Sequence, residues 1–263
     1  MIFPKEFNPR KIKKCDIQES RKRFKNKKNK NLRFLLQERF FWMKQFIKGK
    51  KNIIELGSGN GASRDILKNK KIILTDIQKY SWISKKIDMN KLKLNKKYVK
   101  KVDAFIINQA LHHCASPSKL LKKMSYYLKK DGLVLIREPE LSFFLKFFLF
   151  ILDDEAWSFN VNIFNKKKNI FNPNSPWDAN NATAILLFRN EKKFCKNFPQ
   201  YSIIKNDLSE FFIFLNSGGV VQKTFCIPIN KIFFNFLNYI DKVLIYLFPS
   251  IFALGRTVIL KRK

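Results

Sequence analysis

The sequence predicts an α/β fold in which parallel strands form an open sheet with helices on both of its faces. Residues 53–67 read as a strand, a glycine-rich turn and the start of a helix, and residues 71–75 read as a second short strand that ends on Asp76. Further apolar strand patterns at 102–107 and 133–137 lie on either side of a segment with helical periodicity. Strands and helices that alternate along a chain in this way are typical of a parallel sheet.

The first turn carries three glycines at every second position, Gly57, Gly59 and Gly61, in the run IIELGSGNGASRDIL. Glycine is needed where the backbone adopts positive φ, and where a ligand approaches the main chain more closely than a Cβ would permit. The exposed amides at the start of the following helix then face an anionic or carboxylate-bearing group. The turn is therefore the first candidate for a ligand site.

The spacing of the turn separates two kinds of nucleotide site. The dinucleotide fingerprint is G-x-G-x-x-G, whereas this turn reads E-x-G-x-G-x-G from Glu55. It resembles the first motif of the class I S-adenosylmethionine-dependent methyltransferases of type 11, and the resemblance extends over residues 50–140. It implies a Rossmann-like, seven-stranded methyltransferase sheet and S-adenosylmethionine as the cofactor. In that family the acidic residue and the turn flank the methionine part of the cofactor, which implies cofactor contacts for Glu55, Gly57, Ser58, Gly59 and Gly61.

Two acidic residues further along complete the expected cofactor site. Ligands of open α/β sheets sit over the carboxyl ends of the strands, so Asp76 is placed to accept hydrogen bonds from both ribose hydroxyls of a nucleoside. Asp88 falls where the family has an acidic residue near the adenine amino group. The resemblance also places three neighbouring residues in this site: Ile77, Met89 and Asn108.

The strand at 102–107 leads into a polar turn that contains Asn108 and the only two histidines of the chain, His112 and His113. Methyltransferases of this class commonly have a polar residue and a Leu-His-His turn at this point. A helix is expected to follow over residues 116–130 because apolar residues recur there at helical spacing. The histidine pair is expected either to pack in the turn or to supply a general base for the acceptor.

Beyond the strand at 133–137, the chain leaves the common pattern. Glu138 and Glu140 follow that strand directly, near the carboxyl edge of the sheet, and are further candidates for the base. Residues 141–152 are almost wholly apolar, yet they are too short to span a bilayer, which needs about 20 residues. This segment is expected to form either a buried helix or a helix that lies in a membrane interface.

A loop rich in asparagine and proline covers residues 160–182 and contains the run NSPWDANNA. Four of its side chains suit a sugar or another polar substrate through stacking and hydrogen bonds: Trp177, Asp178, Asn180 and Asn181. Turns use the same residue types for their own local bonds, which is the alternative. The run, together with the Ser-Gly-Gly at 217–219, resembles uncharacterised methyltransferases of bacterial surface-polysaccharide gene clusters. The carboxylate of Asp178 is also a candidate base.

The sheet is expected to close with two antiparallel strands at 201–208 and 256–261. The connection between them, residues 209–255, is unusually long and rich in aromatic residues, and Asp241 and Lys242 interrupt its apolar run. Because the uninterrupted part has only twelve residues, a transmembrane helix is not expected. Such an insertion either contacts a membrane or a lipid substrate, or forms a buried helical cap or a dimer face.

The expected organisation is a basic N-terminal segment followed by one methyltransferase domain. The ranges are 1–30 for the segment and 31–263 for the domain, with a cofactor-binding core at 50–140, a substrate or cap region at 141–200 and a hydrophobic insertion at 209–255. Residues 31–48, at the start of the domain, have an apolar stripe and are expected to pack on the sheet as one helix. The N-terminal segment is either an arm for nucleic acid or a loosely tethered cap over the cofactor site.

The formal net charge is +33, from 53 basic and 20 acidic residues. This charge favours an anionic partner, either a membrane surface or, with less support, nucleic acid. Lysine supplies 43 of the basic residues, so codon drift toward A and T is an alternative source of the charge.

No metal site is expected, because the four cysteines form no CxxC pair and the two histidines are adjacent. Free thiols fit a reducing cytosol. Residues 1–30 lack the apolar run of a cleavable signal. The expected location is the cytoplasm, with peripheral attachment to the inner membrane as an option.

The expected activity is O-methylation of a sugar or a lipid-linked saccharide in bacterial envelope polysaccharide synthesis. A lipid or quinone methyltransferase is the first alternative, and an RNA-binding or RNA-modifying protein on the same fold is the second. The Asn/Asp-Pro-Pro-Tyr/Phe signature of enzymes that methylate nucleobase amines is absent, as is the Pro-Cys of cytosine-C5 enzymes. The candidate bases are His112, His113, Glu138, Glu140 and Asp178.

Overall fold

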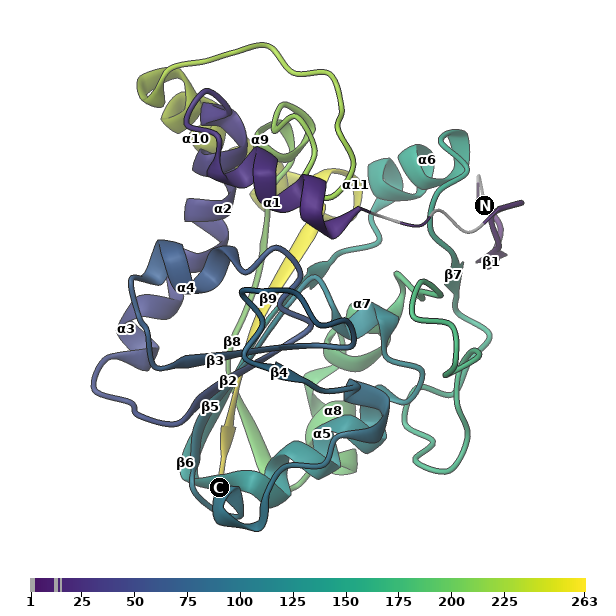
Figure 1. The fold of residues 1–263 in the computed structure, drawn as a ribbon. Coiled ribbons are helices and arrows are strands. Elements are labelled where there is room, and N and C mark those ends of the chain that lie inside the picture. The colour runs from purple at the N-terminus through teal and green to yellow at the C-terminus, as the bar shows by residue number, and fades with distance from the viewer. Residues whose placement is uncertain (1–2, 12–13, 15) are drawn as a thin grey trace.

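The computed structural model describes residues 3–11, 14 and 16–263. Its centre is a seven-stranded sheet in the order β4-β3-β2-β5-β6-β9-β8, with helices on both faces (Figure 1). The strands are β2 (Ile53–Leu56), β3 (Ile72–Asp76), β4 (Lys85–Lys86), β5 (Val102–Asn108), β6 (Leu128–Pro139), β8 (Tyr201–Ser209) and β9 (Gly255–Arg262). The first five run parallel, whereas β9 is antiparallel to both β6 and β8. The predicted fold class is confirmed.

The central strands are buried on both faces, which explains their continuous apolar sequences. In β5, Phe105 and Ile107 belong to the core on one face of the sheet, while Ala104 and Ile106 belong to the core on the other face. Side chains alternate between the faces of a strand, so one short strand supplies both cores.

Each core is covered by its own helices. One face packs against α2 (Lys30–Phe41), α3 (Met43–Ile47) and α4 (Ala62–Leu67), and the other against α5 (Pro117–Tyr127), α7 (Thr183–Phe188) and α8 (Glu191–Asn197). The predicted packing of residues 31–48 on the sheet is confirmed, although two helices meet at Trp42 where one was expected. Short 3₁₀ helices occupy connections: η1 (Met89–Lys91), η2 (Lys96–Tyr98) and η3 (Leu111–His113).

The basic N-terminal segment is packed against the body of the protein. Strand β1 (Glu6–Phe7) pairs with β7 (Trp157–Ser158), and α1 (Ile17–Lys25) lies beside the loop that precedes α10 (Figure 1). The guanidinium of Arg23 donates hydrogen bonds to the carbonyl oxygens of residues 218–222. The described part of residues 1–30 is therefore an integral cap, and the picture of a loosely tethered segment is wrong.

The insertion between β8 and β9 contains α9 (Phe212–Leu215), α10 (Lys231–Leu247) and α11 (Pro249–Phe252). Helix α10 continues through Asp241, although Asp241 and Lys242 interrupt the apolar run of its sequence. The Asp241 carboxylate is buried and accepts hydrogen bonds from three consecutive backbone N–H groups at the start of α9, those of residues 211–213. Burial raises the pKa of Asp241. A residue that reads as a break in the sequence therefore joins two helices.

The aromatic helix α6 (Phe143–Ile151) contacts α11, so the apolar segments at 141–152 and 209–255 form one region. Within the described residues, no helix combines the length and the apolar character that crossing a membrane requires.

A buried ion cluster joins this region to the sheet. Glu210, at the end of β8, accepts hydrogen bonds from Arg39 of α2 at 2.8–3.1 Å and lies 2.7 Å from a guanidinium nitrogen of Arg137 in β6. Gly255 is needed here, because a Cβ at this position would lie 1.7 Å from the Arg137 guanidinium. Burial alone would raise the pKa of Glu210, but the two arginines outweigh it and hold the pKa at about 2.

We predict that Glu210→Gln destabilises the protein at neutral pH, because it leaves two buried guanidinium groups without their carboxylate, a loss of about 3–5 kcal/mol. The folded-state pKa of about 2 lies below the ordinary value of 4.5. The carboxylate therefore stabilises the fold fully above pH 4.5, and this contribution is lost as the pH falls toward 2. Urea unfolding should show a difference between wild type and variant that shrinks between pH 5 and pH 3.

The matched control is Asp207→Asn, which removes an exposed carboxylate that pairs with Lys205 on the same strand. It should change the free energy of unfolding by less than about 1 kcal/mol. An equally small change for Glu210→Gln would contradict the structural role assigned to the cluster.

Candidate functional site

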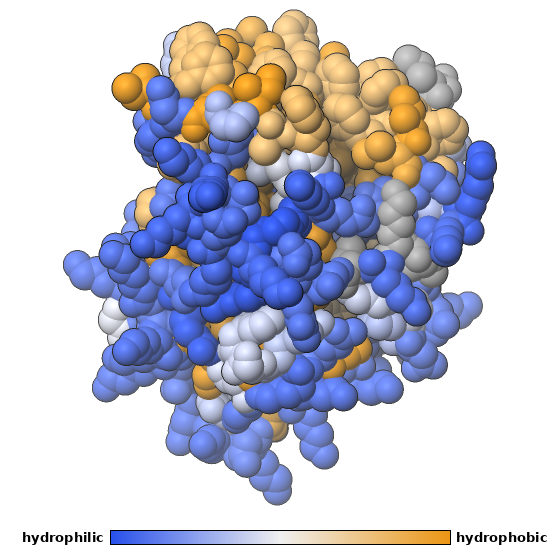
Figure 2. Space-filling model, turned by 45° about the horizontal axis from the view of Figure 1, so that its top comes forward, coloured by the Kyte–Doolittle hydropathy of each residue, from blue (hydrophilic) through white to orange (hydrophobic). Residues whose placement is uncertain are grey.

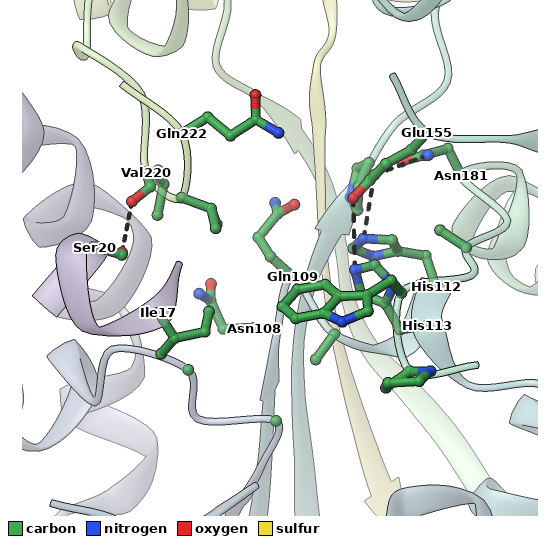
Figure 3. Close-up of a pocket in the computed structure, with 18 of the residues that line it drawn as sticks. Ile17, Ser20, Asn108, Gln109, His112, His113, Glu155, Asn181, Val220 and Gln222 are labelled. Atoms are coloured by element: carbon green, nitrogen blue, oxygen red, sulfur yellow. Dashed lines mark hydrogen bonds and ion pairs between the residues drawn. The ribbon is translucent and has the colours of Figure 1, made fainter. Parts of the chain in front are cut away.

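A cavity of about 800 Å³ opens at the carboxyl ends of β2, β3 and β5. One side is formed by α1 and the loop at 219–224, and the opposite side by the histidine turn and the chain around Glu155 (Figure 3). The glycine turn after β2 lies below α1. Segments from five distant parts of the sequence thus meet around one space.

The glycine turn adopts the positive φ that its sequence requires, with φ of 66° at Gly57, 47° at Gly59 and 67° at Gly61. A Cβ on Gly57 would lie 2.5 Å from the Cβ of Ala110, in the turn after β5, whereas Gly59 faces open space. Gly57, Ser58 and Gly59 line the cavity. Gly61 does not, because it packs beneath the side chain of Trp82, so its expected cofactor contact is corrected to a structural role at the start of α4.

The Asp76 carboxylate is oriented by the turn itself. It accepts hydrogen bonds from the backbone N–H of Gly59 at 2.9 Å and of Gln78 at 3.2 Å, and it lines the cavity. The other residues expected on this side also line it: Ile77, Asp88, Met89 and Asn108. The Asn108 Oδ1 atom is buried and has no hydrogen-bond partner among the described residues. An oriented carboxylate, an open glycine and an unpaired amide oxygen fit a bound nucleoside.

Glu55 is almost fully buried at the bottom of the same wall. Burial raises the pKa of Glu55 to about 8, although hydrogen bonds from the hydroxyls of Ser63 and Ser58 act in the opposite direction. A cationic group in the cavity would favour the ionised carboxylate. This fits an ammonium-bearing ligand next to the glycine turn.

Glu138 of β6 holds the turn that follows β5. Its carboxylate accepts hydrogen bonds from the backbone N–H groups of Ala110, Leu111 and His112 at 2.8–3.1 Å, and lies 2.6 Å from Nδ1 of His112. The side chain is buried and does not line the cavity. The expectation that Glu138 serves as a base is corrected, because all of its acceptor capacity serves the turn.

The two histidine rings present their Nε2 atoms to Glu155, a residue that the sequence did not single out. Nε2 of His112 and Nε2 of His113 each lie 3.6 Å from an oxygen of the Glu155 carboxylate. Nδ1 of His113 lies 3.0 Å from the backbone oxygen of Asp178. All three side chains line the cavity. No local signal marks Glu155, which stands at the end of an acidic run after α6 and 42 positions from His113.

These three groups shift one another's protonation. Burial lowers the pKa of His112, but the carboxylates of Glu138 and Glu155 outweigh burial and raise it. Burial and the neighbouring ring lower the pKa of His113. Burial would raise the pKa of Glu155, but the two rings lower it.

The loop at 160–182 contributes some of the side chains expected from its sequence. Trp177, Asp178 and Asn181 line the cavity, and the Asn181 amide donates to the Glu155 carboxylate at 3.1 Å. Asn180 does not line it, because its amide bonds both backbone groups of Ser158 and the N–H of Ala182. The expected substrate contact of Asn180 is therefore corrected to a local structural role.

Glu140 is also corrected. It forms a two-point ion pair with the Arg256 guanidinium, at 2.6 and 2.9 Å, and it is buried away from the cavity. Of the candidate bases, only His112, His113 and Asp178 line the cavity.

The prediction of no metal site was based on the spacing of the cysteines and on the two adjacent histidines. The fold places Glu155 beside that pair as a third potential ligand. One ligand atom from each of His112, His113 and Glu155 lies within 4.8 Å of the others.

Comparison with known proteins identifies the region around the glycine turn. Residues 54–136 match the family model of the methyltransferase domain of type 11. A crystal structure of a SAM-dependent methyltransferase from Archaeoglobus fulgidus is similar over 88% of this chain and 94% of its own, with a TM-score of 0.53 at 16% identity, and shows the same fold. The YcgJ protein of Bacillus subtilis aligns over 85% of this chain and 97% of its own, with a TM-score of 0.43 at 13% identity. No curated protein matches the sequence.

We predict that Asp76→Ala weakens the binding of S-adenosylmethionine by roughly tenfold or more, because charge-assisted hydrogen bonds are worth about 1.5–3 kcal/mol. Isothermal titration calorimetry measures the affinity. Asp207→Asn, at the far edge of the sheet, is the matched control and should bind as the wild type does. Unchanged affinity in Asp76→Ala would contradict the placement of the ribose at the end of β3.

Proposed function

We propose that this protein, whose residues 54–136 belong to the class I S-adenosylmethionine-dependent methyltransferases, methylates an oxygen of a sugar or of a lipid-linked saccharide. The observation that carries the proposal is the composition of the cavity wall opposite the cofactor residues. Trp177 offers an aromatic face, and Asp178 and Asn181 offer hydrogen-bonding groups beside the histidine pair. A saccharide needs both kinds of contact.

The cofactor residues follow from the geometry of the turn. Asp76 would accept hydrogen bonds from the ribose hydroxyls, Gly57 and Gly59 would let the main chain approach the methionine part, and Glu55 would face its ammonium group. When bound, S-adenosylmethionine supplies a methyl carbon that its sulfonium makes electrophilic. The protein has then to hold the acceptor oxygen in line with that carbon, and positioning of this kind supplies roughly 7–11 kcal/mol.

The cap formed by α1 and the loop at 219–224 would keep water away from the reacting atoms. Ser20 of α1 donates to the backbone oxygen of Val220 at 2.7 Å, and Arg21 donates to the backbone oxygen of Asn60 in the glycine turn, also at 2.7 Å. The contact between Ser20 and Val220 lies along one edge of the cavity (Figure 3). The N-terminal segment thus connects the cofactor turn with the C-terminal insertion.

We propose further that the protein reaches its acceptor at a membrane surface. Exposed apolar side chains of α6, α10, α11 and the loop at 225–227 form a continuous surface, called here the apolar crown (Figure 2). Among its most exposed members are Ile151 of α6, Phe225 of the loop, and Ile232, Tyr239 and Tyr246 of α10. Apolar surface of this extent is typical of contact with a membrane or a partner.

Two observations favour a membrane as the partner of the crown. Leu145 and Leu149 of α6 and Leu152 at its C-terminal end line the cavity, so the crown continues into the proposed acceptor site. The net charge of +33 would attract the protein to anionic head groups. A lipid-linked acceptor could then leave its apolar chain in the bilayer while its head group enters the cavity.

The apolar crown also suits the alternative of a lipid or quinone methyltransferase, which differs only in the group that enters the cavity.

The alternative of an RNA-binding or RNA-modifying protein has less support from α1, because Arg21 pairs with Asp65 and Arg23 binds the 218–222 loop. Those guanidinium groups are engaged within the protein and are not presented to phosphates.

Transfer of tritiated methyl from S-adenosylmethionine tests the activity. The full-length protein is incubated with separate saccharide, lipid-linked, lipid and RNA fractions of the source cell, and Asp76→Ala serves as the cofactor-binding control. We expect label in the saccharide or lipid-linked saccharide fraction. Label confined to apolar lipid would favour the first alternative, and label confined to RNA would overturn the saccharide proposal.

Sedimentation with anionic lipid vesicles tests the crown. Burying one large apolar side chain contributes about 1.5–3 kcal/mol, so Ile232→Asp combined with Tyr246→Asp should lower vesicle binding by roughly tenfold or more. The control is Ile204→Asp, compared also with each single crown substitution, because it places one negative charge at an exposed position of β8 outside the crown. Equal losses in both variants, or vesicle binding that the crown substitution leaves intact, would contradict the proposed membrane contact.

A further inference from the structure

The histidine pair and Glu155 have the arrangement of a metal-binding set. Two Nε2 atoms and one carboxylate converge, with a separation of 3.6 Å between each ring and the carboxylate, and the three ligand atoms lie within 4.8 Å of one another. A tetrahedral zinc ion with bonds of about 2.0–2.1 Å has ligand atoms about 3.3 Å apart. Small side-chain movements would therefore bring all three donors to bonding distance.

The hydrogen bonds on the far side of each ring determine which nitrogen can bind a metal. Nδ1 of His112 lies 2.6 Å from the Glu138 carboxylate, and Nδ1 of His113 lies 3.0 Å from the carbonyl oxygen of Asp178. Both partners can only accept, so each ring donates its Nδ1–H. A neutral ring then has its lone pair on Nε2, which is the atom that faces Glu155.

Neighbouring groups orient the two histidines and Glu155 through hydrogen bonds, as is usual for metal ligands in proteins. A histidine ligand almost always donates its other N–H to a carboxylate or a carbonyl group, and ligating carboxylates are themselves hydrogen-bonded. Glu138 is held by three backbone N–H groups, and Asn181 donates to Glu155 at 3.1 Å. Each of the three donors is thus oriented by a second group.

The contacts inside the cluster leave room for a cation. At 3.6 Å, the distances from Nε2 to the carboxylate exceed the 2.7–3.2 Å of an N–H···O hydrogen bond. When both rings are neutral, their two Nε2 lone pairs face the carboxylate, and a divalent cation between the three groups would be attracted to each of them.

We infer that His112, His113 and Glu155 bind one divalent transition-metal ion, with zinc as the reference ion, on the acceptor side of the cavity. Two imidazole nitrogens and one carboxylate suit zinc and related transition metals, whereas magnesium and calcium prefer oxygen ligands. Three protein ligands leave a coordination position, and all three side chains line the cavity, so that position faces the acceptor site.

The role of the ion rests on the proposed function. An acceptor hydroxyl bound to the metal has a lowered pKa and releases its proton to water. Its oxygen then forms the new bond to the methyl carbon while the C–S bond breaks, and the electron pair of that bond stays on sulfur as a neutral thioether. The ion would thus activate an oxygen acceptor without a separate protein base.

Metal binding is tested first without turnover. The full-length protein is freed of metal with a chelator and titrated with Zn²⁺ in competition with a chromophoric chelator. We expect one zinc ion per chain, and a loss of affinity of at least about 10²-fold in His113→Ala and in Glu155→Gln. Asn181→Ala, which removes only the support of the carboxylate, should cost roughly 10–100-fold.

Two controls separate this site from other effects. Cys195→Ser combined with Cys226→Ser removes the part-buried thiols and should leave the zinc affinity unchanged. Calorimetry with S-adenosylmethionine should give wild-type affinity in His113→Ala and Glu155→Gln, which shows that both variants are folded.

Replacement of zinc by Co²⁺ reports the type of ligand. The cobalt-loaded protein should show visible absorption bands without the near-ultraviolet band of a cobalt–thiolate bond.

Failure to bind zinc in a one-to-one ratio would overturn the inference, as would binding that both ligand variants retain. The site and the proposed function fail separately. Zinc binding that depends on the three ligands, without labelled saccharide, would support the site and reject the acceptor class. Labelled saccharide that forms at the same rate in chelator would support the function and reject the role of the ion, whereas failure to bind zinc in the titration would reject the site.

Discussion

The arrangement of the site depends on one buried carboxylate. Glu138 extends from the end of β6 and binds three successive backbone N–H groups of the turn after β5, together with the ring of His112. A buried carboxylate is costly unless hydrogen bonds satisfy it, and this turn supplies four. The same bonds fix the direction of the histidine pair, so the position of the acceptor wall relative to the cofactor residues follows from the pairing of β5 with β6.

The opposite wall depends on contacts between the two ends of the chain. Arg23 of α1 binds the loop before α10, and Glu210 joins Arg39 of α2 to Arg137 of the sheet. These charged groups are buried or bound to backbone oxygens, so part of the basic composition serves the interior. Among the described residues no lysine is buried, and in the proposed membrane contact the lysines would attract the protein to anionic head groups.

The crown and the cavity adjoin because α6 contributes to both. Its residues Leu145 and Leu149 line the cavity, while Phe150 and Ile151 are exposed at its surface. A helix with two apolar faces, one toward a polar active site and one outward, suits an acceptor that has a polar head and an apolar chain. The metal inference concerns the polar head alone and does not depend on the crown.

The sequence by itself determined what short-range patterns encode. The glycine turn, the strand that ends on Asp76 and the order of strands and helices follow from backbone requirements and apolar periodicity, which are properties of neighbouring residues. The tertiary structure alone decided which polar groups meet. Glu155 reaches the histidines, Asp241 caps α9, and Glu138, Glu140 and Asn180 turn inward to structural partners. A buried charge or amide takes the partner that the packing brings to it, and the distance along the chain does not encode that choice.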